Sequence, residues 1–281
     1  MPISRVISPL IPKRLHGPVK KARYFLDYEL GIRLLRRDPL LPPVGLYPVG
    51  AGNYEKIGEE FFGYFKTLAG LQPTDRVLDV GCGTARMARP LTRYLTDGTY
   101  DGLDISRPAI EWCQKVYTRR FSNFRFHFAD IQNGFFNPRG KQAPAQYRFP
   151  FPDAAFDFVF LTSVFTHMLP LEVENYIAEI ARVMKPAARC LATFFLITPE
   201  AQQLVQAGLS DLKISTAREG YFIADSNNPE YAVGYPEETI RELYRKHGLE
   251  IVEPIRFGFW SGRKDGLSYQ DLVVASRSAS D

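Results

Sequence analysis

VLDVGCGTAR, residues 77–86, joins a short β-rich run to two glycines one residue apart, with a helix expected to begin just after them. Gly81 and Gly83 carry no Cβ, so the backbone can approach a ligand closely and the helix N-terminus points at it. A nicotinamide dinucleotide site would have a third glycine where this chain has Arg86. The loop therefore predicts a nucleoside-like ligand and argues against a pyrophosphate.

Short β-rich runs alternate with helical patterns after this loop. Strands are expected at residues 76–80, 100–105, 124–129, 156–162, 189–197, 249–256 and 270–275, and helices from residue 54 and at 108–120, 171–184 and 236–247. This alternation predicts an α/β fold with a largely parallel sheet and helices on both faces. The loop between the last two strands is too compact for a helical crossover, so these strands should form an antiparallel hairpin.

The chain divides into a basic N-terminal extension, residues 1–53, and a main domain, residues 54–281. Residues 198–235 show no clear strand pattern and are expected to form a lid inserted after the fifth strand. Hydrophobic residues make up 45% and charged residues 23% of the 281 residues, which suits a folded domain. No apolar run approaches the roughly 20 residues of a membrane span. The expected location is cytoplasmic, with peripheral contact to a membrane as an option.

Positive charge is concentrated at the N-terminus. Residues 1–37 hold nine Lys and Arg but two Asp and Glu, whereas the whole chain has a net charge of +4. A basic arm on an acidic body suggests contact with an anionic membrane, a lipid-linked substrate or a nucleic acid. The alternative is a solvated helix that packs Leu26, Leu30 and Leu34 on the body.

Carboxylates follow two further strands. Asp104 ends the second strand a little over 20 residues after the loop, where a carboxylate can accept hydrogen bonds from ribose hydroxyls. Asp130 ends the third strand and can accept from an adenine amino group, while Ile105 and Ile131 cover the ring faces. Because open α/β sheets bind ligands at the carboxyl ends of their strands, these groups predict one nucleoside site.

In motif sequence and order, residues 76–184 resemble the class I S-adenosylmethionine-dependent methyltransferase family. The family pattern E/D-x-G-x-G-x-G is met by DVGCGTA, residues 79–85, with Ala85 in place of the third glycine. The resemblance implies a Rossmann-like, doubly wound seven-stranded sheet of order 3-2-1-4-5-7-6 with the last strand antiparallel. The cofactor would be S-adenosyl-L-methionine, and the product S-adenosyl-L-homocysteine.

The resemblance also assigns roles to single residues. Asp79, Gly81, Cys82 and Gly83 would hold the methionine end, and Thr162 would close over it. Asp104 would bind the ribose and Asp130 the adenine amino group, between Ile105 and Ile131.

His167 is the candidate general base, because it alone of the four histidines follows the fourth strand. An imidazole with an ordinary pKa near 6.5 suits proton removal from a hydroxyl at neutral pH. The alternative is that His167 caps a helix or orients the cofactor. No His, Cys or Asp spacing suggests a metal.

Elimination favours a hydroxyl acceptor. Enzymes that methylate amino groups of nucleic acids have N/D-P-P-Y/F at the end of the fourth strand, where this chain has LTSV, residues 161–164. Enzymes that methylate carbon 5 of pyrimidines need a nucleophilic cysteine there, and this chain has none at that place. Candidate acceptor-binding residues are aromatic side chains with polar tips and one arginine, which suit a sugar or another partly polar ring: Tyr54, Tyr221, Tyr235, Trp260 and Arg263. The alternative for these residues is packing within the lid.

The leading hypothesis is O-methylation of a sugar hydroxyl on a glycan, glycolipid or related small molecule, because the C-terminus resembles the tails of bacterial methyltransferases of surface glycan assembly. The alternatives are an RNA or protein methyltransferase that uses the basic arm, and a non-catalytic protein that binds S-adenosylmethionine. The motifs at the fourth strand argue against a nucleic acid, and the oligomeric state is not predicted.

Overall fold

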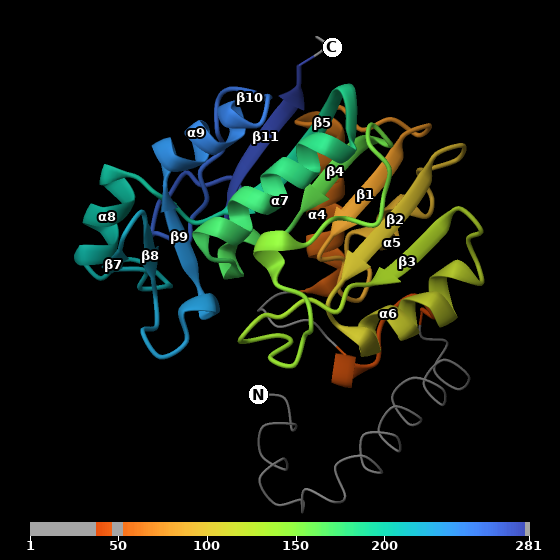
Figure 1. Cartoon of the computed structure of the whole chain (residues 1–281), viewed down its shortest axis with the longest axis horizontal. Helices are drawn as coiled ribbons and strands as arrows, with labels where there is room; N and C mark the ends of the chain where they lie inside the picture. The colour runs from red at the N-terminus through yellow and green to blue at the C-terminus, as the bar shows by residue number, and fades with distance from the viewer. Residues whose placement is uncertain (1–37, 47–52, 279–281) are drawn as a thin grey trace, which may run out of the picture.

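A computed structural model describes residues 38–46 and 53–278. These residues form a central twisted sheet between two layers of helices, with a smaller sheet beside it (Figure 1). The basic arm, residues 1–37, lies outside the described residues. The same holds for Leu26, Leu30 and Leu34, which were expected to pack on the body.

The central sheet has seven strands in the order β10-β11-β5-β4-β1-β2-β3. They are β1 (Arg76–Val80), β2 (Thr99–Asp104), β3 (Phe124–Phe128), β4 (Phe156–Leu161), β5 (Met184–Phe194), β10 (Leu249–Ile251) and β11 (Asp271–Arg277). β11 runs antiparallel to both β5 and β10, whereas β1 to β5 are mutually parallel where they pair. The expected strand order, with its antiparallel last strand, is confirmed.

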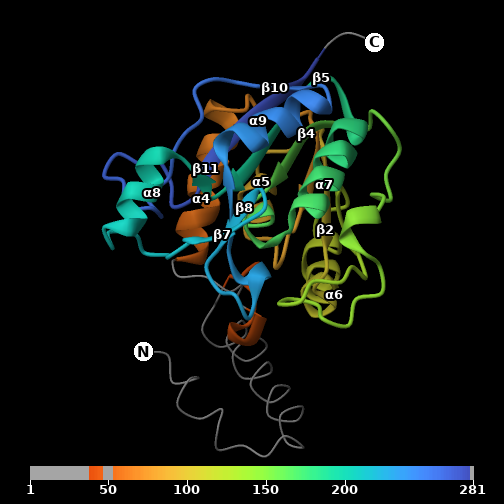
Figure 2. The same cartoon turned by 60° about the vertical axis from the view of Figure 1, so that its left-hand side comes forward.

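Two hydrophobic clusters hold helices on opposite faces of this sheet, and a third cluster holds the helix Pro199–Gln206. The helices are α4 (Tyr54–Thr67), α5 (Ala88–Leu91), α6 (Arg107–Cys113), α7 (Pro170–Val183), α8 (Pro199–Gln206) and α9 (Glu237–Lys246). α7 and α9 share one cluster, and α4, α5 and α6 share the other, so α7 and α4 lie on different sides of the sheet (Figure 2). The helix expected at residues 108–120 is α6 followed by a π-helical turn, Gln114–Thr118.

Local sequence explains where the main helices begin. The Asn53 side chain accepts hydrogen bonds from the amides of Glu55 and Lys56, at 3.0 and 2.9 Å, and so caps α4. α7 begins with Pro170, and Glu172 accepts from the amide of Leu169 at 2.7 Å.

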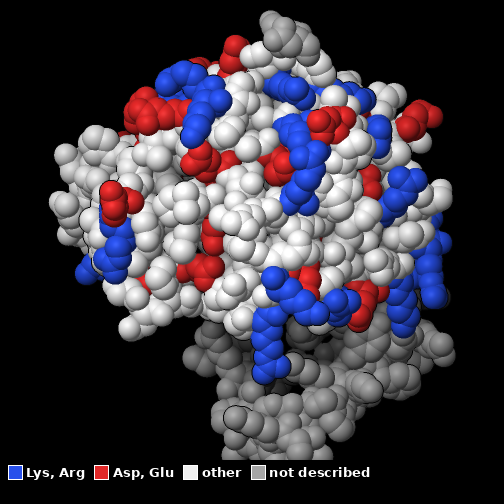
Figure 3. All heavy atoms as spheres, viewed as in Figure 1, with Lys and Arg blue, Asp and Glu red and all other residues white. Residues whose placement is uncertain are grey.

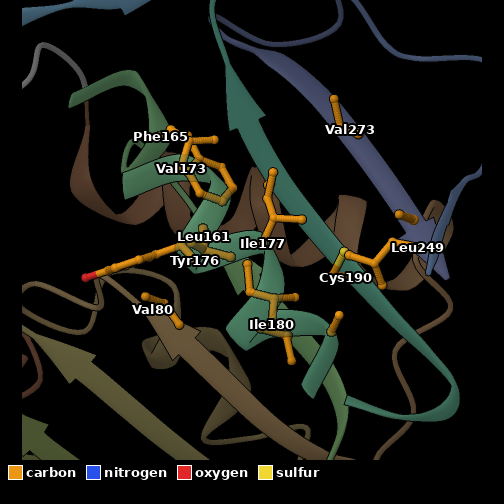
Figure 4. Packing of buried hydrophobic residues seen from close by; sticks show 14 of the residues in the cluster. Val80, Leu161, Phe165, Val173, Tyr176, Ile177, Ile180, Cys190, Leu249 and Val273 are labelled. Carbon is orange, nitrogen blue, oxygen red and sulfur yellow. The ribbon is translucent and has the colours of Figure 1, made fainter. Parts of the chain in front are cut away.

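The buried face of α7 packs on the sheet through side chains at helical spacing. Val173, Ile177 and Ile180 point from α7 toward β4 and β5, where Leu161 and Cys190 face them (Figure 4). All five side chains are at most 1% exposed. Burying one such aliphatic side chain contributes roughly 1.5–3 kcal/mol, so this contact fixes the helix that follows the β4 loop.

Residues 198–235 contain strands that the sequence did not predict. β7 (Thr216–Arg218), β8 (Tyr221–Ile223) and β9 (Val233–Pro236) join β6 (Leu196–Ile197) in a sheet of order β6-β9-β8-β7. Strands of three or four residues are too short to show a period-two pattern. Pairing with β6, which continues directly beyond β5, attaches this segment, here called the lid, to the main sheet.

Candidate cofactor and acceptor site

The glycine loop after β1 has the backbone conformation that its glycines permit. Gly81 and Gly83 have φ of 86° and 51°, in the left-handed region. A Cβ on Gly81 would lie 2.3 Å from Cγ2 of Val164, so the loop packs against the segment after β4. A Cβ on Gly83 would meet nothing within 4 Å. Ala85 also takes a positive φ, 63°, and so reproduces the conformation of the glycine that it replaces.

Asp104 closes the loop from the end of β2. Its Oδ2 accepts a hydrogen bond from the amide of Gly83 and its Oδ1 accepts one from the amide of Ser106, both at 2.6 Å. Burial raises the pKa of the Asp104 carboxyl, and these two bonds oppose the rise. The carboxylate expected at the ribose therefore lies beside the open space at Gly83.

Asp79 is the most deeply buried carboxyl of the site, with 1% exposure. Its Oδ2 accepts from the Tyr100 hydroxyl at 2.6 Å, while Oδ1 has no hydrogen-bond partner among the described residues. Burial raises the pKa of Asp79 to about 8, and the neighbouring Asp104 adds to the rise. The contact with Tyr100 was not anticipated, because only the pairing of β1 with β2 brings the two side chains together.

The third strand ends next to Asp104. The amide of Ala129 donates to the Asp104 carbonyl at 2.9 Å, which places Asp130 one residue beyond this contact. Ile131 is 2% exposed, and Ile105 packs partly buried on the same core. The two aspartates expected at the nucleoside therefore follow adjacent strands at one edge of the sheet.

Two further expected cofactor residues lie at the same edge. Thr162 is the first residue after β4, which pairs with β1, and its side chain is partly exposed. Cys82 is buried between the two glycines, where burial raises the pKa of its thiol well above the ordinary value. A thiol of this kind stays protonated and packs as a small apolar group.

His167 ends a 3₁₀ turn, Phe165–His167, that follows β4. Its Nδ1 lies 3.0 Å from the Glu230 carbonyl oxygen of the lid. A carbonyl can only accept, so Nδ1 donates and the lone pair of the neutral ring lies on Nε2. Burial lowers the pKa of His167 below 6.5, against the effect of the backbone of Glu230 and Tyr231, and keeps the ring neutral at pH 7.

The residues expected at the acceptor contact other groups of the protein. The Tyr235 hydroxyl donates to the Met168 carbonyl at 2.6 Å, and Tyr221 stacks on Tyr235 with ring centroids 6.5 Å apart. Trp260 has no exposed surface, and its indole N–H donates to Asp271 at 2.8 Å.

Arg263 and Tyr54 are also engaged. Arg263 pairs with Glu200 and donates to Thr198 Oγ1 at 2.9 Å. Tyr54 is buried at the start of α4, and its hydroxyl donates to the carbonyl of Thr84 in the glycine loop. Tyr54 therefore lies at the methionine end of the expected cofactor site, away from its expected place at the acceptor.

Three aromatic residues that the sequence reasoning missed form a row of ring contacts that ends at His167. Phe135 and Phe136 from the loop after β3 and Tyr231 from the lid are 38%, 43% and 44% exposed. Their rings meet edge to face, and the Phe136 ring lies 5.0 Å from the His167 ring. Phe135, Phe136 and Tyr231 are called the aromatic rim below. The signal in the sequence for these residues was the adjacent pair Phe135-Phe136 in a predicted loop.

Glu230 joins the lid to the loop after β3. Its Oε2 accepts from the amide of Gly134 at 2.5 Å, and its Oε1 accepts from Asn133 Nδ2 at 3.1 Å. The same Asn133 amide group donates to the His167 carbonyl at 3.1 Å. Glu230 therefore links the lid, the aromatic rim and His167 in one network.

The surface charge and the arrangement of possible metal ligands add little to the description of the site. Basic side chains gather at one edge of the face in Figure 3, over β3 and α6, while both signs mix elsewhere on that face. Within residues 38–46 and 53–278, no cluster of His, Cys, Asp or Glu is arranged to hold a metal ion. In the same part of the chain no helix has the length and hydropathy of a membrane span.

Comparison with known proteins identifies the central region. Residues 78–192 match the family described as "Methyltransferase domain". The chain is 31% identical to a fatty-acid O-methyltransferase of Mycolicibacterium smegmatis, over 64% of this chain and 62% of that protein. It is 31% identical to phthiotriol/phenolphthiotriol dimycocerosates methyltransferase 1 of Mycobacterium ulcerans, over 42% and 36%. The chain thus spans less than two thirds of the length of these relatives.

Solved structures share the fold at low identity. Magnesium protoporphyrin IX methyltransferase from Synechocystis PCC 6803, solved with bound SAH, is 18% identical with a TM-score of 0.51, over 92% of this chain and 99% of that chain. The [4+2]-cyclase SpnF is 17% identical with a TM-score of 0.52, over 84% and 86%. Since one fold carries both activities, the fold alone does not give the reaction. The strand order is that of the Rossmann-like methyltransferase fold, and residues 78–192, which include most of the glycine loop, match the methyltransferase domain family.

Proposed function

We propose that this protein transfers a methyl group from S-adenosylmethionine to an oxygen atom of an amphiphilic small molecule, such as a lipid or a glycolipid. The observation that carries the proposal is His167, neutral and oriented by the lid, beside the exposed aromatic rim. The proposal includes the sugar hydroxyl expected from the sequence, provided that an apolar chain accompanies it.

The residues at the strand ends fit S-adenosylmethionine. Gly83 faces open space, and Asp79 Oδ1 and Thr84 Oγ1 are buried without a hydrogen-bond partner among the described residues. Such orphaned polar atoms in a buried site call for a polar ligand. In this assignment Asp79 and the glycine loop hold the methionine end, with Cys82 as loop packing and Thr162 beside it.

The nucleoside part has its own set of residues. Asp104 binds the ribose hydroxyls and Asp130 the adenine amino group, with Ile105 and Ile131 against the ring. When bound, the cofactor supplies an electrophilic methyl group for in-line displacement.

His167 removes the proton of the acceptor hydroxyl. The Glu230 carbonyl fixes the tautomer with the proton on Nδ1, so Nε2 accepts the acceptor proton. The lid carries that carbonyl, and so couples its own position to the orientation of the base. A carboxylic acid acceptor, already ionised at neutral pH, would not need this step.

The aromatic rim supports an apolar partner for the rest of the acceptor. Three large rings exposed together on two segments form a patch rather than scattered surface residues. The curated relatives are named for fatty acid and phthiotriol dimycocerosate acceptors, and this agrees with an apolar chain lying on the rim.

The test is transfer from methyl-labelled S-adenosylmethionine by the purified full chain. Fatty acids, long-chain alcohols and glycolipids form one panel, and free sugars, RNA and proteins form the other. We expect label in the amphiphile panel. Label confined to RNA or protein, or no transfer to any acceptor, would refute the proposal.

Replacing His167 with Ala should lower kcat for a hydroxyl acceptor about 10²- to 10⁴-fold, the usual contribution of general-base catalysis. Affinity for S-adenosylhomocysteine, measured by calorimetry, should stay within about threefold because His167 is not in the cofactor set. His247→Gln, after α9, is the matched histidine control and should retain kcat. Equal kcat in His167→Ala and the parent protein would remove His167 from this role.

A further inference from the structure

Arg86 is partly buried, and the part of the chain that the structure describes gives it no acidic partner. Neighbouring arginines on the same segment are paired: Arg89 with Asp38 and Glu55 at 2.6 and 2.9 Å, and Arg93 with Glu59. Among the described residues no Asp or Glu lies within salt-bridge distance of Arg86. A guanidinium removed from water without a carboxylate or phosphate is costly. The pattern points to an anionic ligand.

The surroundings of Arg86 hold it at the glycine loop. Its guanidinium carbon lies 5.6 Å from the centroid of the Tyr54 ring, a cation–π contact. The Tyr54 hydroxyl in turn donates to the Thr84 carbonyl, so α4, the loop and the arginine form one unit. Burial lowers the pKa of Arg86, and Tyr54 is the group that opposes the change.

A second polar group near Arg86 also lacks a partner. Thr84 Oγ1, two residues earlier, is buried and makes no hydrogen bond with the described residues. Gly83, one residue before Thr84, is open to a ligand. The Tyr54 side chain contacts both Thr84 and Arg86, so a guanidinium and a hydroxyl on neighbouring residues form a donor set suited to a carboxylate.

We propose that Arg86, with the Thr84 hydroxyl, binds the α-carboxylate of the methionine end of the cofactor. This inference rests on the proposed cofactor. The carboxylate of a fatty acid acceptor has the same chemistry. Arg86, however, belongs to the loop after β1, whereas His167 follows β4 and the rim comes from the loop after β3 and from the lid. Asp79 then binds the ammonium group of the same methionine end.

The test compares S-adenosylhomocysteine with S-adenosyl-3-thiopropylamine, which lacks only the carboxylate. For the unmodified protein, calorimetry should show about 10- to 100-fold weaker binding of the decarboxylated ligand, the size of a charge-assisted hydrogen bond. In Arg86→Met the affinity for S-adenosylhomocysteine should fall to that of the decarboxylated ligand, whose own affinity should stay nearly unchanged. Arg86→Lys should retain part of the preference. Arg93→Met is the matched control and should keep the full preference.

Each outcome decides the inference. If the unmodified protein binds both ligands equally, or if Arg86→Met weakens both by the same factor, Arg86 does not contact the carboxylate. An Arg86→Met effect on acceptor KM with an unchanged ligand preference would assign Arg86 to an acceptor carboxylate instead. If Arg86→Met does not fold, the unmodified protein and Arg86→Lys still give the preference. Failure of the unmodified protein to bind S-adenosylhomocysteine would overturn the proposed cofactor itself.

Discussion

Asp79 shows how one buried carboxyl links the site to pH. Its pKa of about 8 lies far above the value near 3.9 of an unfolded chain, because burial disfavours the charge. Folding therefore favours the protonated form: the stability that this form contributes is complete below about pH 4 and is lost as pH rises through about 8. At neutral pH the free protein holds Asp79 neutral.

We predict that cofactor binding releases a proton from Asp79. An ammonium group beside Asp79 favours the ionised carboxylate, so affinity for S-adenosylhomocysteine should rise from pH 6.5 to about 8, by up to roughly tenfold per pH unit, and then level off. Calorimetry in two buffers of different ionisation enthalpy measures the proton directly. In Asp79→Asn the affinity should be lower and independent of pH, and a flat profile for the unmodified protein would contradict the prediction.

At the scale of the elements, the side chain of Glu230 makes the contact that positions the lid. Glu230 follows β8 in the chain, yet its carboxylate accepts from Gly134 and Asn133 after β3. A Cβ on Gly134 would lie 2.2 Å from Glu230 Oε2, so the two segments have no spare room there. This contact also holds the lid carbonyl that orients His167.

We predict that Glu230→Ala destabilises the protein by about 1–2 kcal/mol, since it removes the carboxylate that accepts hydrogen bonds from the Gly134 amide and from the side chain of the buried Asn133. Urea unfolding measures the loss, and amide exchange should become faster in residues 229–236 and 131–137. Glu219→Ala, an exposed lid carboxylate, should change stability by less than about 0.5 kcal/mol. Equal stability of Glu230→Ala and Glu219→Ala would mean that the contact does not hold the lid.

For the whole molecule, charge separates the N-terminus from the rest of the chain. Residues 1–37 have a surplus of seven positive charges on a chain of net charge +4, so the remainder is acidic. Such an arm would bring an enzyme to an anionic surface that also holds an amphiphilic acceptor.

We predict that the full chain binds vesicles containing anionic phospholipid and not purely zwitterionic vesicles, with binding lost as salt is raised. The full-length variant Lys20→Gln, Lys21→Gln, Arg23→Gln should lose most of this binding in a sedimentation assay, because each charge near the surface contributes roughly 1 kcal/mol.

A control variant with the same change in net charge keeps the prediction specific. Arg119, Lys213 and Lys264 are exposed on the described body, and replacing all three with Gln should leave vesicle binding intact. Equal loss in both triple variants would show that net charge, rather than the arm, drives binding.

The sequence by itself predicted the central sheet, and it placed the two aspartates of the expected nucleoside site at the ends of adjacent strands. The GCG loop after a β-rich run, and aspartates at the ends of the next two strands, are local patterns, because a glycine turn and a strand end depend on neighbouring residues. The order of the strands, which the resemblance to the methyltransferase family implied, is confirmed by the sheet.

Only the tertiary structure decided which side chains are left for a ligand. It engages Trp260, Tyr235 and Arg263 with protein partners, and it leaves Arg86 without a carboxylate from residues 38–46 and 53–278. The aromatic rim, too, exists only because the lid folds back over the loop after β3. Hydrogen bonds and ring contacts between residues nearly 100 positions apart depend on how the layers pack, and no local pattern records them.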